Sequence, residues 1–149
     1  MDAMALKKAA ERDKKMLDLL KGWKSLEEET IDSCARISRK SKNPIIKTLI
    51  TAIKNDSKKH RSIIKLIINS MTKKAFVLTP DDLAGVSGLL NKHIAIEQKS
   101  IDTANEAIEI SRDATIKHLL RFILEDEKQH EKLLVQMNKL KFMVTARVT

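Results

Sequence analysis

Carboxylate and imidazole side chains recur in this chain at a spacing that suits a metal ion. The separation between Glu27 and His60 is the same as that between Glu97 and His130. Glu127 stands one helical turn before His130 and forms a Glu-x-x-His pair with it. Oxygen-rich ligand sets with two imidazoles suit iron or manganese better than structural zinc. The predicted metal ligands are therefore Glu27, His60, Glu97, Glu127 and His130.

The two sets of candidate ligands belong to an internal repeat, in which Glu27 corresponds to Glu97 and His60 to His130. A repeat of this kind determines the architecture, because each copy must form the same local structure. It predicts two copies of one helical hairpin within a single domain over residues 1–149. The first-copy residues that recur unchanged are Leu19, Leu20, Glu27, Ile31, Asp32, Ser41, Ile46, Lys47, Leu49, Ile53, Asp56, Lys58 and His60.

One position breaks the repeat at the place that matters most for metal binding. The second copy has Glu127 one turn before its histidine, whereas the first copy has Ser57 at that position. A serine hydroxyl is short and neutral, so the first copy lacks the carboxylate that the second copy has. Asp56 is adjacent but is rotated by about 100° around a helix. His93, one turn before Glu97, is a less favoured replacement ligand.

Four long amphipathic helices are predicted to position these residues. Apolar side chains recur at spacings of three and four residues in each of them, which is typical of a helix bundle. The first covers residues 3–39, and the second begins at Asn43 and Pro44, a capping residue followed by proline at the first helical position. Residues 73–79 connect to a third helix capped by Thr79, and a break near 111–113 precedes the fourth.

The spacing also predicts the height of each candidate ligand along the helices. Glu27 lies about fifteen residues before the tip of the first hairpin, and His60 lies about as far beyond it. The same relation holds for Glu97 and Glu127 in the second copy. Charged groups on apolar helix faces need a partner, and a bound cation would provide one. The fold class expected is therefore an all-α, up-down four-helix bundle with the ligands in one internal layer.

On these motifs, the chain resembles the ferritin-like superfamily, specifically its rubrerythrin-type branch, across roughly residues 16–140. The motifs are residues 27–31, 56–60, 97–101 and 126–130. The resemblance implies a ferritin-like bundle with a di-iron carboxylate site, built from a glutamate on each of two helices and a Glu-x-x-His on each of the others. It implies that Glu27 and Glu97 are the single-glutamate ligands, Glu127 a bridging carboxylate, and His60 and His130 the imidazole ligands.

Two absences separate the chain from relatives with more elaborate chemistry. The sequence contains no tyrosine, which excludes a tyrosyl-radical role. Cys34 is the sole cysteine of this sequence, so no cysteine-rich iron domain like that of rubrerythrins proper is expected within it. A single cysteine also fits a reducing compartment, and no apolar run approaches a membrane span, so a cytoplasmic location is expected.

The net charge of +9 is spread along the chain, and the scarcity of aromatic residues argues against nucleic-acid binding.

The function expected is that of a rubrerythrin-like metal-binding protein. Iron is the favoured metal, with manganese or another divalent transition metal as the alternative. Oxidase or peroxidase-type activity on oxygen or peroxide is the inherited chemistry, weakened by Ser57. The sequence leaves open whether the chain is an enzyme. The alternative is a metal-poor bundle that serves as an oligomeric interaction module for acidic partners. A homodimer or larger assembly is expected from additional apolar positions at Ile45, Leu49, Ile63 and Ile68.

Overall fold

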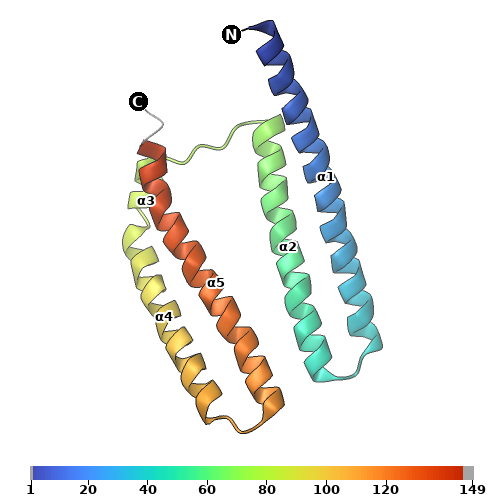
Figure 1. Ribbon diagram of the computed structural model, residues 1–149, viewed down its shortest axis with the longest axis vertical. Coiled ribbons are helices and arrows are strands. Elements are labelled where there is room, and N and C mark those ends of the chain that lie inside the picture. Colours follow the sequence, from blue (N-terminus) through green and yellow to red (C-terminus); the bar gives the residue numbers. More distant parts are fainter. Residues whose placement is uncertain (1, 146–149) are drawn as a thin grey trace. The chain divides into compact units, whose positions relative to one another are not determined.

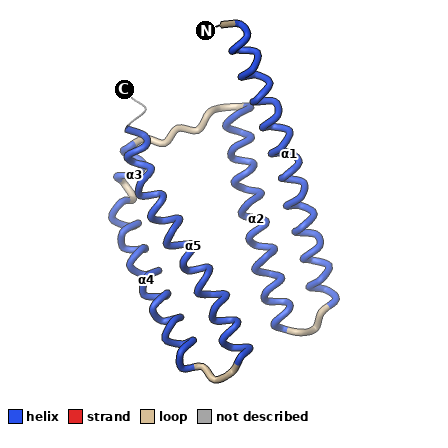
Figure 2. Tube along the Cα trace, in the orientation of Figure 1, coloured by secondary structure: helices blue, strands red, loops and turns tan. Residues whose placement is uncertain are grey.

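The computed structural model describes residues 2–145 of the chain, with side chains through residue 140. Every regular element within that range is a helix, which confirms the predicted all-α class (Figures 1 and 2). None of the described helices is long and apolar enough to cross a membrane. The helices are α1 (Ala3–Lys40), α2 (Pro44–Thr72), α3 (Pro80–Ala84), α4 (Ser87–Ile110) and α5 (Ala114–Thr145).

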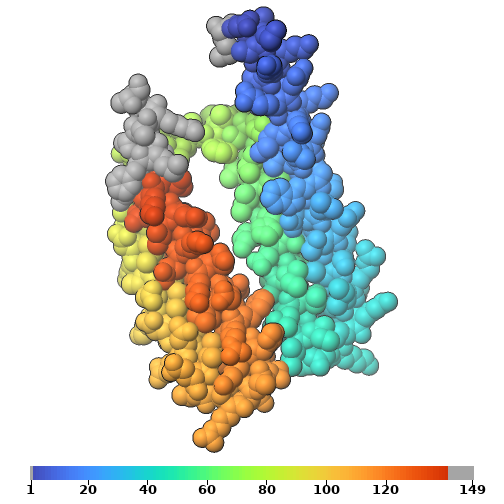
Figure 3. Space-filling view, viewed as in Figure 1, coloured from blue at the N-terminus to red at the C-terminus, as the bar shows by residue number. Residues whose placement is uncertain are grey.

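The chain divides into two compact units that correspond to the two copies of the repeat. The first unit, Met1–Phe76, contains the hairpin of α1 and α2, and the second, Val77–Thr149, contains the hairpin of α4 and α5 with the short α3. In each hairpin the two long helices pack side by side, and the N-terminal part of α1 extends beyond α2 (Figures 1 and 3). The two predicted hairpins are confirmed, and their union in one domain stays a prediction.

The turns of the two hairpins are built in the same way. In the first, the Ser41 N–H donates to the Ile37 carbonyl at 3.0 Å, which ends α1. Asn43 Oδ1 then accepts from the Ile46 N–H at 3.4 Å and caps α2. The equivalent pairs in the second copy are Ser111 with Ala107 at 3.0 Å and Asp113 Oδ1 with the Ile116 N–H at 2.9 Å.

These equal turns give the two hairpins the same register. Glu27 lies as far before the turn at 41–43 as Ser57 lies after it. Both residues are therefore about 21 Å from the turn along their helices. Glu97 and Glu127 occupy the same places in the second hairpin. The prediction that candidate ligands return to one height is confirmed within each hairpin.

The third predicted helix is interrupted near its start. Thr79 and Asp82 form the predicted cap as a reciprocal pair, with the Asp82 N–H donating to Thr79 Oγ1 at 3.2 Å and the Thr79 N–H donating to Asp82 Oδ2 at 2.9 Å. Gly85 then ends α3, and the Val86 N–H bonds the Leu83 carbonyl at 3.2 Å in a tighter turn. Glycine has a low helix propensity, so a break after the first turn costs little here.

Each hairpin has a small apolar core that polar residues interrupt at the level of the candidate ligands. Ser57 and Glu97 are the polar residues buried among the described side chains, and they come from different hairpins. Apolar packing elsewhere holds each pair of helices together, because it removes hydrocarbon surface from water. The buried apolar residues are Leu20, Cys34 and Ile64 in the first hairpin and Leu83, Ile101, Ala104 and Leu124 in the second.

The Asn43 cap predicts a measurable stability effect. Asn43→Ala removes the acceptor for the Ile45 and Ile46 N–H groups, so the free energy of unfolding should fall by about 1 kcal/mol. Asn43→Asp retains a side-chain oxygen and should keep most of the stability. Urea unfolding followed by circular dichroism measures both variants. Equal stability of Asn43→Ala and the natural chain would show that this cap does not hold the start of α2.

Candidate metal centre

The second hairpin gathers three of the predicted ligands. Oxygen and nitrogen atoms of Glu97 on α4 and of Glu127 and His130 on α5 all lie within 4.8 Å of one another. His130 Nδ1 is 3.8 Å from Glu97 Oε1 and 3.9 Å from Glu127 Oε1. Glu127 and His130 share one face because residues three apart are neighbours on a helix. The cluster therefore offers two carboxylates and one imidazole to a single ion.

Glu97 carries the strongest sign of a missing partner in this cluster. Its side chain is only 10% exposed, and its Oε2 atom is buried with no hydrogen-bond partner among the described residues. Burying a charged oxygen without a partner is unfavourable. A divalent cation beside Glu97 Oε2 would supply the missing interaction, and carboxylate with imidazole is a donor set that iron and manganese accept. The residues present therefore fit the metal that the resemblance implies.

The two carboxyl groups of this cluster have opposite pKa shifts. The hydrogen bond with Glu127, together with His93 and the charge of His130, lowers the pKa of Glu97, although burial opposes this. The same hydrogen bond, burial and the charge of Glu97 raise the pKa of Glu127. The proximity of the two carboxyl groups thus favours the ionised form of Glu97 over that of Glu127, as expected for carboxyl groups that share a site. A bound metal ion would favour the ionised form of both carboxyl groups.

The first hairpin surrounds its glutamate with hydrogen-bond donors. Glu27 Oε1 accepts from Trp23 Nε1 at 3.1 Å, and His60 Nδ1 lies 3.3 Å from the same oxygen. Burial acts to raise the pKa of Glu27, but hydrogen bonds from Ser57 and Trp23 and the charge of His60 lower it overall. Glu27 and His60 are therefore brought together as predicted. Their surroundings already stabilise the ionised carboxylate without a metal.

Asp56 does not replace the carboxylate that Ser57 lacks. Its side chain is 55% exposed and forms an ion pair with Lys59 at 3.2 Å on the outer face of α2. Ser57 faces inward and is almost fully buried. The rotation of about 100° between neighbouring helical residues explains why the two point in different directions. The first hairpin thus has one carboxylate at this level, whereas the second has two.

Both candidate imidazole ligands are more exposed than their positions on the apolar faces of the predicted helices suggest. The side chains of His60 and His130 are 46% and 52% exposed, whereas those of Glu27 and Glu97 are 12% and 10% exposed. The spacing of apolar residues assigns a residue to one face of a helix, but a long side chain at the margin of that face still reaches solvent. Each hairpin therefore buries its carboxylate and keeps its imidazole at the edge.

Sequence reasoning misses the role of the position one turn before each single glutamate. Helical periodicity assigns only packing to Trp23 and makes His93 a less favoured ligand. In the structure, Trp23 Nε1 is 3.1 Å from Glu27 Oε1 and His93 Nε2 is 3.0 Å from Glu97 Oε1. Trp23 and His93 are equivalent positions of the repeat. That equivalence, with the spacing of one helical turn, is the signal that could have revealed their shared role.

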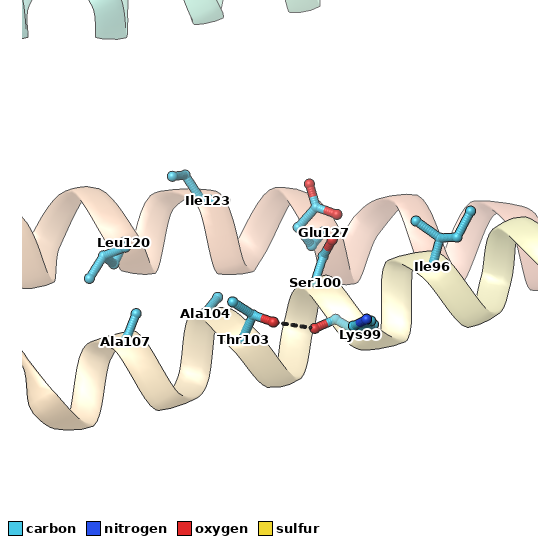
Figure 4. A pocket seen from close by; sticks show the side chains of 9 residues that line it. All are labelled: Ile96, Lys99, Ser100, Thr103, Ala104, Ala107, Leu120, Ile123 and Glu127. Carbon is cyan, nitrogen blue, oxygen red and sulfur yellow. Dashed lines mark hydrogen bonds between the residues drawn. The ribbon is translucent and has the colours of Figure 1, made fainter.

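A groove of about 420 Å³ lies beside the carboxylates of the second hairpin. Figure 4 shows Glu127 near Ser100, with Ala104 and Ala107 further along α4. The equivalent residues to these three α4 positions in the first hairpin are Thr30, Cys34 and Ile37, which are larger. The smaller side chains leave space between the helices. The groove therefore gives small molecules room next to Glu127.

The comparisons with known proteins identify the family. The rubrerythrin family model matches residues 25–138, which include every predicted ligand. The chain therefore belongs to the rubrerythrin family, within the ferritin-like superfamily, and its all-α helical-bundle fold agrees with that assignment. Searches of curated proteins and of solved structures gave no match. The assignment of Glu27, His60, Glu97, Glu127 and His130 as ligands, and their convergence on one layer, stay predictions.

The raised pKa of Glu127 predicts how stability depends on pH in the metal-free protein. A proton on Glu127 stabilises the fold at low pH, and this contribution is lost as pH rises through the raised pKa. Glu127→Gln keeps a donor for Glu97 without the charge. The Glu127→Gln variant should therefore melt at a higher temperature than the natural chain at neutral pH. Each kcal/mol gained in the free energy of unfolding should raise the melting temperature by about 2–4 °C.

This difference should shrink as the pH is lowered through the raised pKa of Glu127, because both chains then carry a neutral group. Thermal melts in the presence of a chelator over a series of pH values measure it. Glu125→Gln is the matched control, since Glu125 is exposed on the same helix and pairs only with Lys128 at 3.6 Å among the described residues. A constant difference at every pH would contradict the pKa assignment.

Proposed function

We propose that this protein binds iron, with manganese or another divalent transition metal as an alternative, through Glu97, Glu127 and His130. One observation carries the proposal: the buried Glu97 Oε2 has no hydrogen-bond partner among the described residues, within a cluster of metal-ligating groups. Exposed acidic clusters are common without a metal, but a buried carboxylate oxygen without a partner is costly. Membership of the rubrerythrin family supports the same assignment.

Each residue has a distinct part in this proposal. Glu97 would offer its partnerless oxygen, Glu127 in its ionised form would be a second anionic ligand, and His130 would supply a neutral ring nitrogen. Glu27 and His60 would form a second, weaker site. Ser57 leaves that site short of one negative charge. Bound iron would supply one-electron redox chemistry with small oxidants.

Oxidase or peroxidase-type activity is the chemistry proposed for the loaded protein. The groove lined by Glu127 supports this proposal, because it provides space for a molecule as small as oxygen or hydrogen peroxide beside that carboxyl group. Its lining combines apolar residues, including Ala104, Leu120 and Ile123, with the polar side chains of Lys99, Ser100 and Thr103. The test is peroxide consumption by the iron-loaded natural chain, with Glu127→Ala as the inactive comparison.

Metal stoichiometry tests the unequal sites. The natural chain should bind one divalent ion tightly and a second weakly, because the Ser57 hydroxyl contributes no charge. Ser57→Glu should raise occupancy toward two ions per chain, and Glu127→Ala should abolish binding. Calorimetric titration with Mn²⁺ or Fe²⁺, followed by metal analysis after desalting, measures each variant. The metal-poor interaction module is favoured instead if the natural chain retains no metal.

Ser62→Glu is the matched control for this titration. Ser62 is exposed on the same helix, so its replacement adds the same charge away from the candidate ligands. It should leave the stoichiometry unchanged. Two tight and equal sites in the natural chain, with no effect of Ser57→Glu, would show that another residue completes the first site.

The sole tryptophan tests whether the two ligand sets converge. Trp23 contacts Glu27 in the first hairpin, whereas the stronger site is proposed in the second. Co²⁺ quenches tryptophan fluorescence only at short range. If the two ligand sets converge, Co²⁺ bound in the second hairpin should quench the fluorescence of Trp23 in the natural chain. His60→Ala should keep this quenching, and Glu127→Ala should remove it. Quenching that survives Glu127→Ala and is lost in His60→Ala would instead place the ion in the first hairpin alone.

A further inference from the structure

The two hairpins place a nitrogen donor one turn before each single glutamate. Trp23 Nε1 meets Glu27 Oε1 at 3.1 Å, and His93 Nε2 meets Glu97 Oε1 at 3.0 Å. The two aromatic residues differ in type but occupy the same position of the repeat. Residues four apart are neighbours on one helix face, so this contact is available wherever the pair occurs. The same contact in both copies points to a shared role toward the glutamate.

The hydrogen bond determines which oxygen of Glu97 is left for another partner. His93 occupies Oε1, while Oε2 is buried and has no hydrogen-bond partner among the described residues. A carboxylate fixed in this way is held in one rotamer with one oxygen directed away from its donor. His130 Nδ1 lies 3.8 Å from Oε1, beyond hydrogen-bond distance, and does not compete for it.

The chemistry of the pair determines which way the proton points. An ionised carboxylate only accepts hydrogen bonds, so His93 must donate from Nε2. The indole N–H of Trp23 is a donor and never a metal ligand. Because the first hairpin makes the contact with a residue that cannot bind metal, donation to the carboxylate is the property common to both copies. The side chain of His93 is 54% exposed, which places it at the margin of the cluster.

We propose that His93 is a positioning residue, which holds Glu97 Oε1 and so presents Oε2 as the single ligating oxygen to a divalent cation. This inference rests on the proposed function of the same site. Hydrogen bonds of this kind to metal ligands orient them before the ion arrives. His93 acts through Glu97 and does not itself contact the ion.

Substitution of His93 separates this role from direct ligation. Co²⁺ titration followed by visible absorption gives the affinity, and the intensity of the absorption bands reports the number and geometry of the ligands. His93→Ala removes the donor and should weaken Co²⁺ binding by about 10- to 100-fold. His93→Trp copies the first hairpin, restores an N–H donor that cannot ligate, and should recover most of the lost affinity with an unchanged spectrum.

Two further variants make the comparison specific. His93→Gln provides an amide N–H at the same position and should behave as His93→Trp does. His118→Ala removes an exposed histidine elsewhere in the same hairpin and should leave Co²⁺ affinity unchanged. Circular dichroism melts of the metal-free variants show which are folded. In the metal-free natural chain, long-range ¹⁵N NMR should find the proton of neutral His93 on Nε2.

Each result decides between explanations of the site. If the natural chain binds no Co²⁺, the proposed function fails, and the role of His93 fails with it. If the natural chain and His93→Ala bind Co²⁺ equally, only the positioning role fails. If His93→Trp and His93→Gln are as weak as His93→Ala and their spectra change, His93 is itself a ligand. A neutral His93 protonated on Nδ1 would also overturn the proposal.

Discussion

A carboxylate placed between two packed helices must find donors or a cation, and this requirement governs the polar structure of both hairpins. Glu27 and Glu97 lie at the same level of the repeat, yet their surroundings differ. Trp23, Ser57 and His60 stabilise the ionised form of Glu27. Glu97 instead lies beside a second carboxyl group, that of Glu127, and keeps one buried oxygen without a partner among the described residues. The buried carboxylate therefore has hydrogen-bond donors around it in the first hairpin, whereas in the second hairpin one of its oxygens still lacks a partner among the described residues.

This requirement can be met only if the helices pair in a fixed register, which the turns provide. Ser41 and Asn43 end one helix and begin the next, and their counterparts Ser111 and Asp113 do the same in the second copy. One extra residue in either turn would shift the second helix by about 1.5 Å and rotate its side chains by about 100°. The residue opposite the glutamate would then face another direction. The short turns are therefore as necessary to the candidate site as its ligands are.

Much of this organisation could be predicted from the sequence, because it depends on local signals. Caps at Asn43 and Thr79 give helix starts, and the repeat gives two hairpins and the Glu97, Glu127 and His130 cluster. The break at Gly85 and Val86 was not predicted, since a weak helix start can continue or stop with little difference in free energy. The hydrogen bond of Trp23 was missed because rotamers depend on neighbours that periodicity does not identify.

The difference between the hairpins has a physical consequence for how such a site can hold metal. A carboxylate whose oxygens already accept neutral donors gains little from a cation, because binding must first displace those hydrogen bonds. A carboxylate with a partnerless buried oxygen gains more, and a neighbouring carboxyl group in its ionised form supplies a second negative ligand. Unfavourable groups of this kind persist at functional sites although they reduce stability. Ser57 therefore leaves the carboxylate of the first hairpin better satisfied by hydrogen bonds, and Glu127 gives the second hairpin the larger set of candidate metal ligands.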